Sequence, residues 1–180
     1  MSRREGPPGR ETAAARSNVR WVWYGYGQLG RAEKSGFGLF LHDTVRIYAE
    51  VSVLSLPVLF AIMAAPTPGA LDAKATGLVA WLVMTLVGTL VRGGWVRPLA
   101  SPAPGWVRLS PSLLALRVGY FNLALAVATF GGLAVAAAVT GVVAGSLAGP
   151  LAALAWAGGV AAVSMLAFPR VTGAWLAMWG

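Results

Sequence analysis

Four long apolar runs, separated by breaks rich in proline or glycine, dominate the sequence from residue 44 onward. A helix that crosses a hydrocarbon core of about 30 Å needs about 20 residues. Residues 118–169 carry no charged side chain and are too long for one crossing, so Gly145, Ser146, Gly149 and Pro150 are expected to form a turn between two crossings. The predicted spans are residues 44–65, 74–92, 112–140 and 150–169.

These runs predict an all-α integral membrane protein with four transmembrane helices. The ten-residue alternation that barrel strands require is missing, and the length of the runs favours helices. Pro57 lies inside the first span and predicts a kink there, because proline lacks a backbone N–H and clashes with the preceding turn.

Three segments outside the predicted spans flank them at the two ends of the chain. Residues 1–20 are basic and contain too little apolar surface to offset chain entropy, so we expect a disordered basic tail. Residues 21–43 combine clustered Trp and Tyr with several glycines and predict an interfacial segment, because these rings settle at the headgroup level. Residues 170–180 are short and apolar and predict an interfacial C-terminus.

The distribution of basic residues predicts the orientation. Basic residues are concentrated before residue 43, in the connection 92–111 and at Arg170. In the other two connections the only charged residues are Asp72 and Lys74. Cytoplasmic loops collect Lys and Arg. Four crossings place all the basic segments on one face, which predicts that both chain ends are cytoplasmic (N-in/C-in) in a cell inner (plasma) membrane.

Composition supports the membrane class and narrows the chemistry. Hydrophobic residues make up 57% of the chain and charged residues 11%, well below the roughly 25% of a soluble domain. The chain has no cysteine and one histidine, which excludes disulfides, thiolate metal sites and paired imidazoles. The common nucleotide-binding, hydrolase and metalloprotease motifs are missing, so we expect no cofactor and no metal.

The densest polar cluster near a span contains Asp43, Arg46 and Glu50. Their helical spacing of i, i+3 and i+7 predicts one shared face. Glu50 reaches the hydrocarbon region, where an ionisable group is costly. It is interpreted either as half of an intrahelical Arg46–Glu50 pair or, if the protein is an enzyme, as an acid–base catalyst tuned by Asp43.

Three polar residues in the third span are candidates for a polar cavity or substrate site together with Arg46: Arg117, Tyr120 and Asn122. Arg117 is expected to snorkel to the cytoplasmic headgroups, because long cationic side chains do so readily. Alternatively, Arg117 meets Glu50 from the first span, since both lie at similar depth.

Two short patterns predict membrane contacts. Gly94-Trp95-Val96-Arg97 recurs as Gly105-Trp106-Val107-Arg108, and both units are expected to anchor the loop against anionic headgroups. Gly141, Gly145 and Gly149 are interpreted either as turn residues or as a close helix-packing motif.

The sequence favours a polytopic membrane protein that acts as a small subunit, or as an assembly or transport component, through helix packing. Its expected partners are membrane lipids and either copies of itself or a larger membrane complex. One alternative is an intramembrane enzyme acting on a lipid or isoprenoid-like substrate by acid–base catalysis with Glu50. A further alternative is an exporter, channel or conjugation-spread protein. The basic tail favours lipid over nucleic acid, which we do not expect as a partner.

Overall fold

The computed structural model describes residues 19–23, 29–66, 72–101, 104–142 and 147–179. Over these residues the chain is all-helical apart from one pair of short strands, and it contains five helices. The strands β1 and β2 pair antiparallel, with Trp21 opposite Arg31. The elements are β1 (Val19–Trp23), β2 (Leu29–Glu33), α2 (Gly36–Leu54), α3 (Leu56–Ala64), α4 (Ala73–Gly93), α5 (Pro111–Val142) and α6 (Ala148–Trp179).

The flanks predicted from sequence overlap these elements only in part. Of the predicted disordered tail 1–20, residues 1–18 lie outside the described residues, and the last two begin β1. The predicted interfacial segment 21–43 contains most of the strand pair and the start of α2, and its residues 24–28 are also outside the description. The predicted interfacial C-terminus is continuous with α6, which extends to Trp179.

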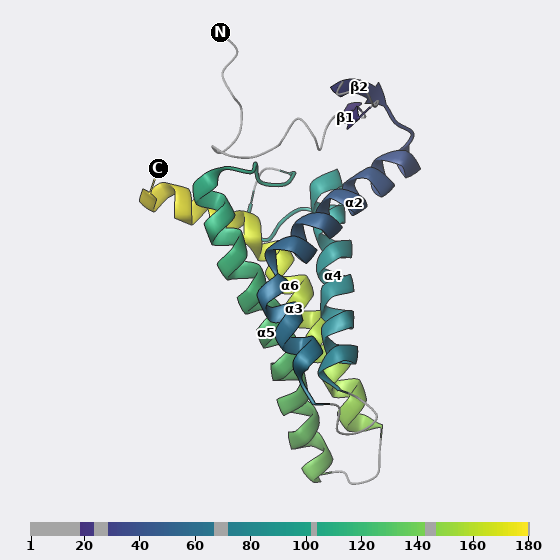
Figure 1. The fold of residues 1–180 in the computed structure, drawn as a ribbon, viewed down its shortest axis with the longest axis vertical. Coiled ribbons are helices and arrows are strands. Elements are labelled where there is room, and N and C mark those ends of the chain that lie inside the picture. The colour runs from purple at the N-terminus through teal and green to yellow at the C-terminus, as the bar shows by residue number, and fades with distance from the viewer. Residues whose placement is uncertain (1–18, 24–28, 67–71, 102–103, 143–146, 180) are drawn as a thin grey trace.

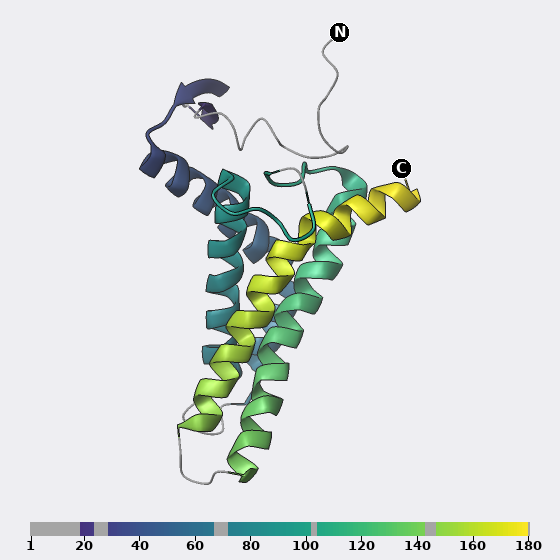
Figure 2. The ribbon, with the colours of Figure 1, turned by 180° about the vertical axis from the view of Figure 1, so that it is seen from behind.

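The long helices α4, α5 and α6 lie side by side and form the body of the molecule (Figure 1, Figure 2). The helix α3 packs along this body, whereas α2 leans outward from it at one end (Figure 1). The connection between α4 and α5 and the end of α6 lie at that same end, whereas the end of α5 and the start of α6 lie at the opposite end. We call the end that holds the connection between α4 and α5 the loop end of the bundle.

Three helices are long and apolar enough to cross a membrane, namely α4, α5 and α6. The pair α2 and α3 passes the same test only if the two bent helices are counted as one span. The helices α5 and α6 have 32 residues each, or about 48 Å at 1.5 Å per residue, so they are longer than a hydrocarbon core is thick.

The predicted kink in the first apolar run is confirmed. The helices α2 and α3 meet at Ser55 with a bend of 69°. Pro57 is the second residue of α3, where its missing N–H costs least and its fixed φ suits a helix start. Ser55 is buried, and its hydroxyl donates a hydrogen bond to the Val51 carbonyl.

Small residues let the helices approach closely. A Cβ atom added at Gly132 of α5 would lie 2.9 Å from the backbone carbonyl oxygen of Ala153 in α6. One added at Gly88 of α4 would lie 2.7 Å from the Met165 side chain and 2.8 Å from Ile47. Gly149, from the glycine pattern noted above, packs against Thr140, whereas Gly141 faces open space and Gly145 lies outside the described residues.

We predict that Gly132→Ala destabilises the bundle by about 1–3 kcal/mol, because the backbone oxygen facing the new methyl group cannot move aside as a side chain could. Thermal unfolding in detergent micelles measures this. The matched control is Gly141→Ala in the same helix, where nothing lies within 4 Å of the added atom. A neutral or stabilising effect at both positions would show that the α5–α6 contact is looser than described.

Candidate functional site

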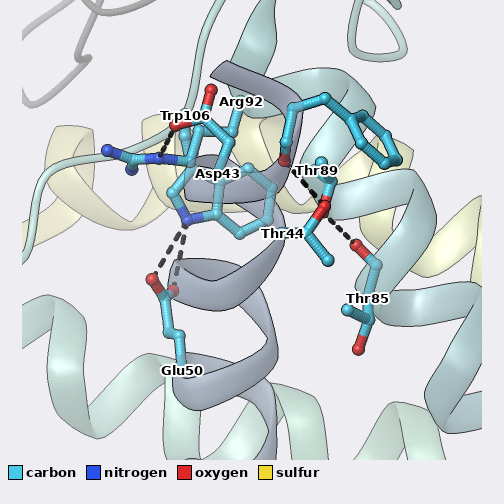
Figure 3. A network of polar contacts seen from close by, with 8 residues as sticks. Asp43, Thr44, Glu50, Thr85, Thr89, Arg92 and Trp106 are labelled. Carbon is cyan, nitrogen blue, oxygen red and sulfur yellow. Dashed lines mark hydrogen bonds and ion pairs between the residues drawn. The ribbon is translucent and has the colours of Figure 1, made fainter. Parts of the chain in front are cut away.

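A buried ion pair joins α2 to α5 near the loop end of the bundle. The Arg117 Nε atom lies 2.8 Å from the Glu50 Oε1 atom, and the two side chains are 0% and 8% exposed. The indole N–H of Trp106, from the connection between α4 and α5, donates to both carboxylate oxygens at 3.2 and 3.3 Å (Figure 3). Glu50 is therefore contacted by two donors from separate parts of the chain.

Arg117 is fixed on more than one side. Its Nη2 atom donates to the Val107 carbonyl oxygen at 2.6 Å, and its guanidinium carbon lies 5.7 Å from the centre of the Phe168 ring of α6. The expectation that Arg117 snorkels toward headgroups is wrong, because this side chain is fully buried. The alternative, that Arg117 meets Glu50, describes the structure.

A second buried ion pair joins α2 to α4. The Arg92 Nε atom lies 3.2 Å from the Asp43 Oδ1 atom, with side-chain exposures of 4% and 0% (Figure 3). From the sequence alone, Arg92 is expected only among the basic residues of a loop. The last turn of α4 presents it to α2 instead. The helix ends one residue later at Gly93 and is capped by Gly94, which has the left-handed conformation (φ 79°) favoured by glycine.

The helical period explains which face of α2 is buried. Asp43, Ile47, Glu50 and Val51 follow one another at i, i+4, i+7 and i+8, and the first, second and last are fully buried. Arg46, three residues after Asp43 and four before Glu50, lies at the edge of this face and is exposed. Glu50 also pairs across helices with Arg117, so a pair with Arg46 on α2 does not by itself account for the Glu50 carboxylate.

The two units of the Gly-Trp-Val-Arg repeat differ in environment. Trp95 is 47% exposed, as an interfacial anchor would be, whereas Trp106 is fully buried. The Trp106 ring packs 5.3 Å from Phe168, centre to centre, while its N–H contacts Glu50. The anchoring role predicted for Trp106 is wrong, since this residue fastens the loop to the inside of the bundle.

Asn122 lies at the bend between α2 and α3, away from the ion pairs. Its Oδ1 atom accepts from the Val58 N–H at 3.0 Å, and its Nδ2 atom donates to the Leu54 carbonyl oxygen at 2.8 Å. In an unbroken helix Leu54 and Val58 would bond directly to each other, because they are four residues apart. The Asn122 amide takes the place of that bond and satisfies both groups.

Tyr120 belongs to the aromatic packing around the first ion pair. Its hydroxyl donates to the Ser164 carbonyl oxygen at 2.8 Å, and its ring lies 5.2 Å from Phe168. The candidate residues therefore separate into three places: Glu50 and Arg117 with Tyr120 nearby, Asp43 with Arg92, and Asn122 at the bend.

The two ion pairs connect α2 to the neighbouring helices α4 and α5. Two carboxylates face two guanidinium groups, so the buried charges cancel, and both Glu50 oxygens accept hydrogen bonds. Within the described ranges, no group of three His, Asp or Glu side chains could hold a metal ion.

The chain is a helical protein with three apolar helices long enough to span a membrane and with charges paired inside the bundle. The chain belongs to a family described as a domain of unknown function (DUF8215), which matches residues 34–175. No curated protein and no solved structure matches the chain. The family match begins just before α2 and includes both ion pairs, the bend and Trp106.

We predict that Arg117→Leu destabilises the protein by about 3–5 kcal/mol, because it leaves the Glu50 carboxylate buried without its cation. The double variant Glu50→Leu/Arg117→Leu should regain much of this loss, since no unpaired charge remains. Unfolding by titration with a denaturing detergent measures both. Arg108→Leu is the matched control, because Arg108 is exposed. Additive losses in the double variant would contradict the pairing.

We predict that Asn122→Leu loosens the bend, because the Leu54 carbonyl and Val58 N–H lose their partner. The chain lacks cysteine, so spin labels can be attached at Leu41→Cys in α2 and Met63→Cys in α3, both exposed positions. The distance distribution between the labels should shift or broaden. The neighbouring exposed Leu123→Ala serves as control. An unchanged, narrow distribution in Asn122→Leu would show that Pro57 alone holds the bend.

Proposed function

We propose that this chain is a four-span protein of the cell inner membrane with both ends in the cytoplasm. In this proposal it works as a small subunit, or as an assembly or transport component, by packing against copies of itself or a larger membrane complex. The bent pair α2 and α3 counts as the first crossing, and α4, α5 and α6 supply the other three. Together α2 and α3 contain 28 helical residues, enough for a crossing in which α2 is strongly tilted.

The placement of exposed charge supports this orientation. Arg97, Arg108 and Arg170 are exposed and belong to the segments at the loop end, where α2 also begins. At the other end, the start of α4 contributes Asp72 and Lys74, which offset each other. An excess of Lys and Arg is the signal that retains loops in the cytoplasm.

The contacts of Glu50 argue against the enzymatic alternative. A general acid or base needs an oxygen that can reach the substrate, either directly or through one water molecule. In this protein both carboxylate oxygens accept from Trp106, one also pairs with Arg117, and the side chain is 8% exposed. The same pairing removes Arg117 from the lining that an exporter or channel path would need.

The observation that carries the proposal is the outward surface of α5 and α6. Ala155, Gly159 and Val163 follow one another at helical spacing on the exposed side of α6, and Ala137 and Gly141 do so on α5. Nothing lies within 4 Å of a Cβ atom added at Gly141 or Gly159. Small residues four apart allow a second helix to approach closely in a membrane, where packing drives association.

We predict that Gly159→Leu dissociates the assembly while leaving the bundle folded, because the added side chain points into open space within one chain and blocks only a neighbour. Size-exclusion chromatography with light scattering in mild detergent measures the mass. Gly173→Leu is the matched control, because Gly173 is equally open but follows Arg170 at the end of α6. A wild-type protein that is monomeric and co-purifies with nothing would contradict the proposal.

A further inference from the structure

The first half of α2 presents three different faces. One face, with Asp43 and Ile47, is buried against the bundle. A second face is exposed and apolar. Its side chains recur at intervals of four, four and three residues, which places them on the same side of the helix. Its members are Phe37, Leu41, Val45 and Tyr48, which are 72%, 46%, 67% and 48% exposed. We call these four residues the α2 stripe.

The third face of this helix is cationic. Arg46 is exposed and lies nine residues, or two and a half turns, from Phe37, so it points away from the start of the stripe. The approach to the helix carries Arg31 and Lys34, with Glu33 between them. Three cations against one exposed carboxylate therefore accompany the stripe, while the two acids of α2, Asp43 and Glu50, are bound to arginines inside the bundle.

In the proposed four-span orientation, the inclination of α2 places the stripe at the level of the membrane surface. The 69° bend turns α2 away from α3, which follows the bundle, and α2 leans outward at the loop end (Figure 1). Phe40, beside the stripe, packs 5.8 Å from Trp95, an exposed indole of the loop, so the helix is held at the depth of that ring. A helix with an apolar face and a cationic face at this depth lies in the interface of a bilayer.

We propose that the first half of α2 is an interfacial helix that binds the anionic lipids of the cytoplasmic leaflet, with the α2 stripe among the acyl chains and Lys34 and Arg46 at the phosphates. This inference rests on the proposed four-span orientation and adds the class of lipid to it. Charge complementarity between these cations and the lipid headgroups identifies anionic lipid as the binding partner. An anionic leaflet attracts each nearby Lys or Arg by about 1 kcal/mol, equivalent to about a five-fold preference over neutral lipid.

The test uses brominated lipids, which quench a fluorophore that they touch. The full chain carries one fluorophore at Leu41→Cys and is reconstituted in phosphatidylcholine vesicles containing either brominated phosphatidylglycerol or brominated phosphatidylcholine. We expect quenching by lipids brominated near the headgroup, with an association constant about 25 times higher for phosphatidylglycerol, because Lys34 and Arg46 contribute about five-fold each. Lys34→Gln/Arg46→Gln should bring that ratio close to one.

A second labelling position separates this inference from the proposed membrane function. Leu78→Cys lies on the exposed side of α4 toward the opposite end of the bundle, and it should be quenched equally by both lipids. Equal quenching at Leu41→Cys would overturn the anionic preference. Quenching there by aqueous iodide alone, or protection from both lipid and water, would show that water or a protein covers the stripe. Loss of lipid quenching at Leu78→Cys would instead overturn the membrane function itself.

Discussion

The ion pair between Glu50 and Arg117 is the contact on which the polar end of this bundle depends. A carboxylate or guanidinium buried among apolar helices is costly unless a partner of opposite charge and further hydrogen bonds replace water. Here the Trp106 indole N–H donates a hydrogen bond to the carboxylate. The guanidinium donates to the Val107 carbonyl oxygen and lies over the Phe168 ring. Because these partners come from α2, α5, α6 and the connecting loop, satisfying two charges fixes the relative positions of four parts of the chain.

The same rule of satisfying polar groups internally explains the bend. Proline at position 57 removes one donor from the first apolar run, and the Asn122 amide substitutes for the direct bond between Leu54 and Val58. The bend lets α2 lean outward while α3 follows the bundle, so α2 can offer Asp43 to Arg92 and Glu50 to Arg117 from a single face. At the bend and at the ion pairs alike, polar groups inside the bundle are therefore satisfied by other protein groups instead of water. The DUF8215 match extends over residues 34–175 and so covers all of the residues that make these contacts in this chain.

The sequence predicted the long apolar helices and the kink, because length, hydrophobicity and proline act locally. It named Glu50 and Arg117 as possible partners, since depth along a span can be counted from its ends. Arg92 and Trp106 were missed as site residues because nothing local marks them. Trp95 and Trp106 stand in the same four-residue pattern, yet one is exposed and the other buried, and only the path of the loop across α6 decides which. Asn122 was recognised as polar and in need of partners, but its partners are backbone groups of another helix, which side-chain patterns do not reveal.

The central claim is that α2 and α3 cross the membrane as one bent span, so that both buried ion pairs lie at the cytoplasmic end of a four-span bundle. Labelling with a membrane-impermeant maleimide tests it most directly in this cysteine-free chain. Single cysteines are introduced at Glu33, at Ser101 in the loop and at Leu147 between α5 and α6. The account predicts that in intact cells only Leu147→Cys reacts, and that the other two react after permeabilisation. Glu33→Cys and Ser101→Cys reacting from opposite sides would contradict it, because α2 and α3 would then enter and leave the membrane on the same face.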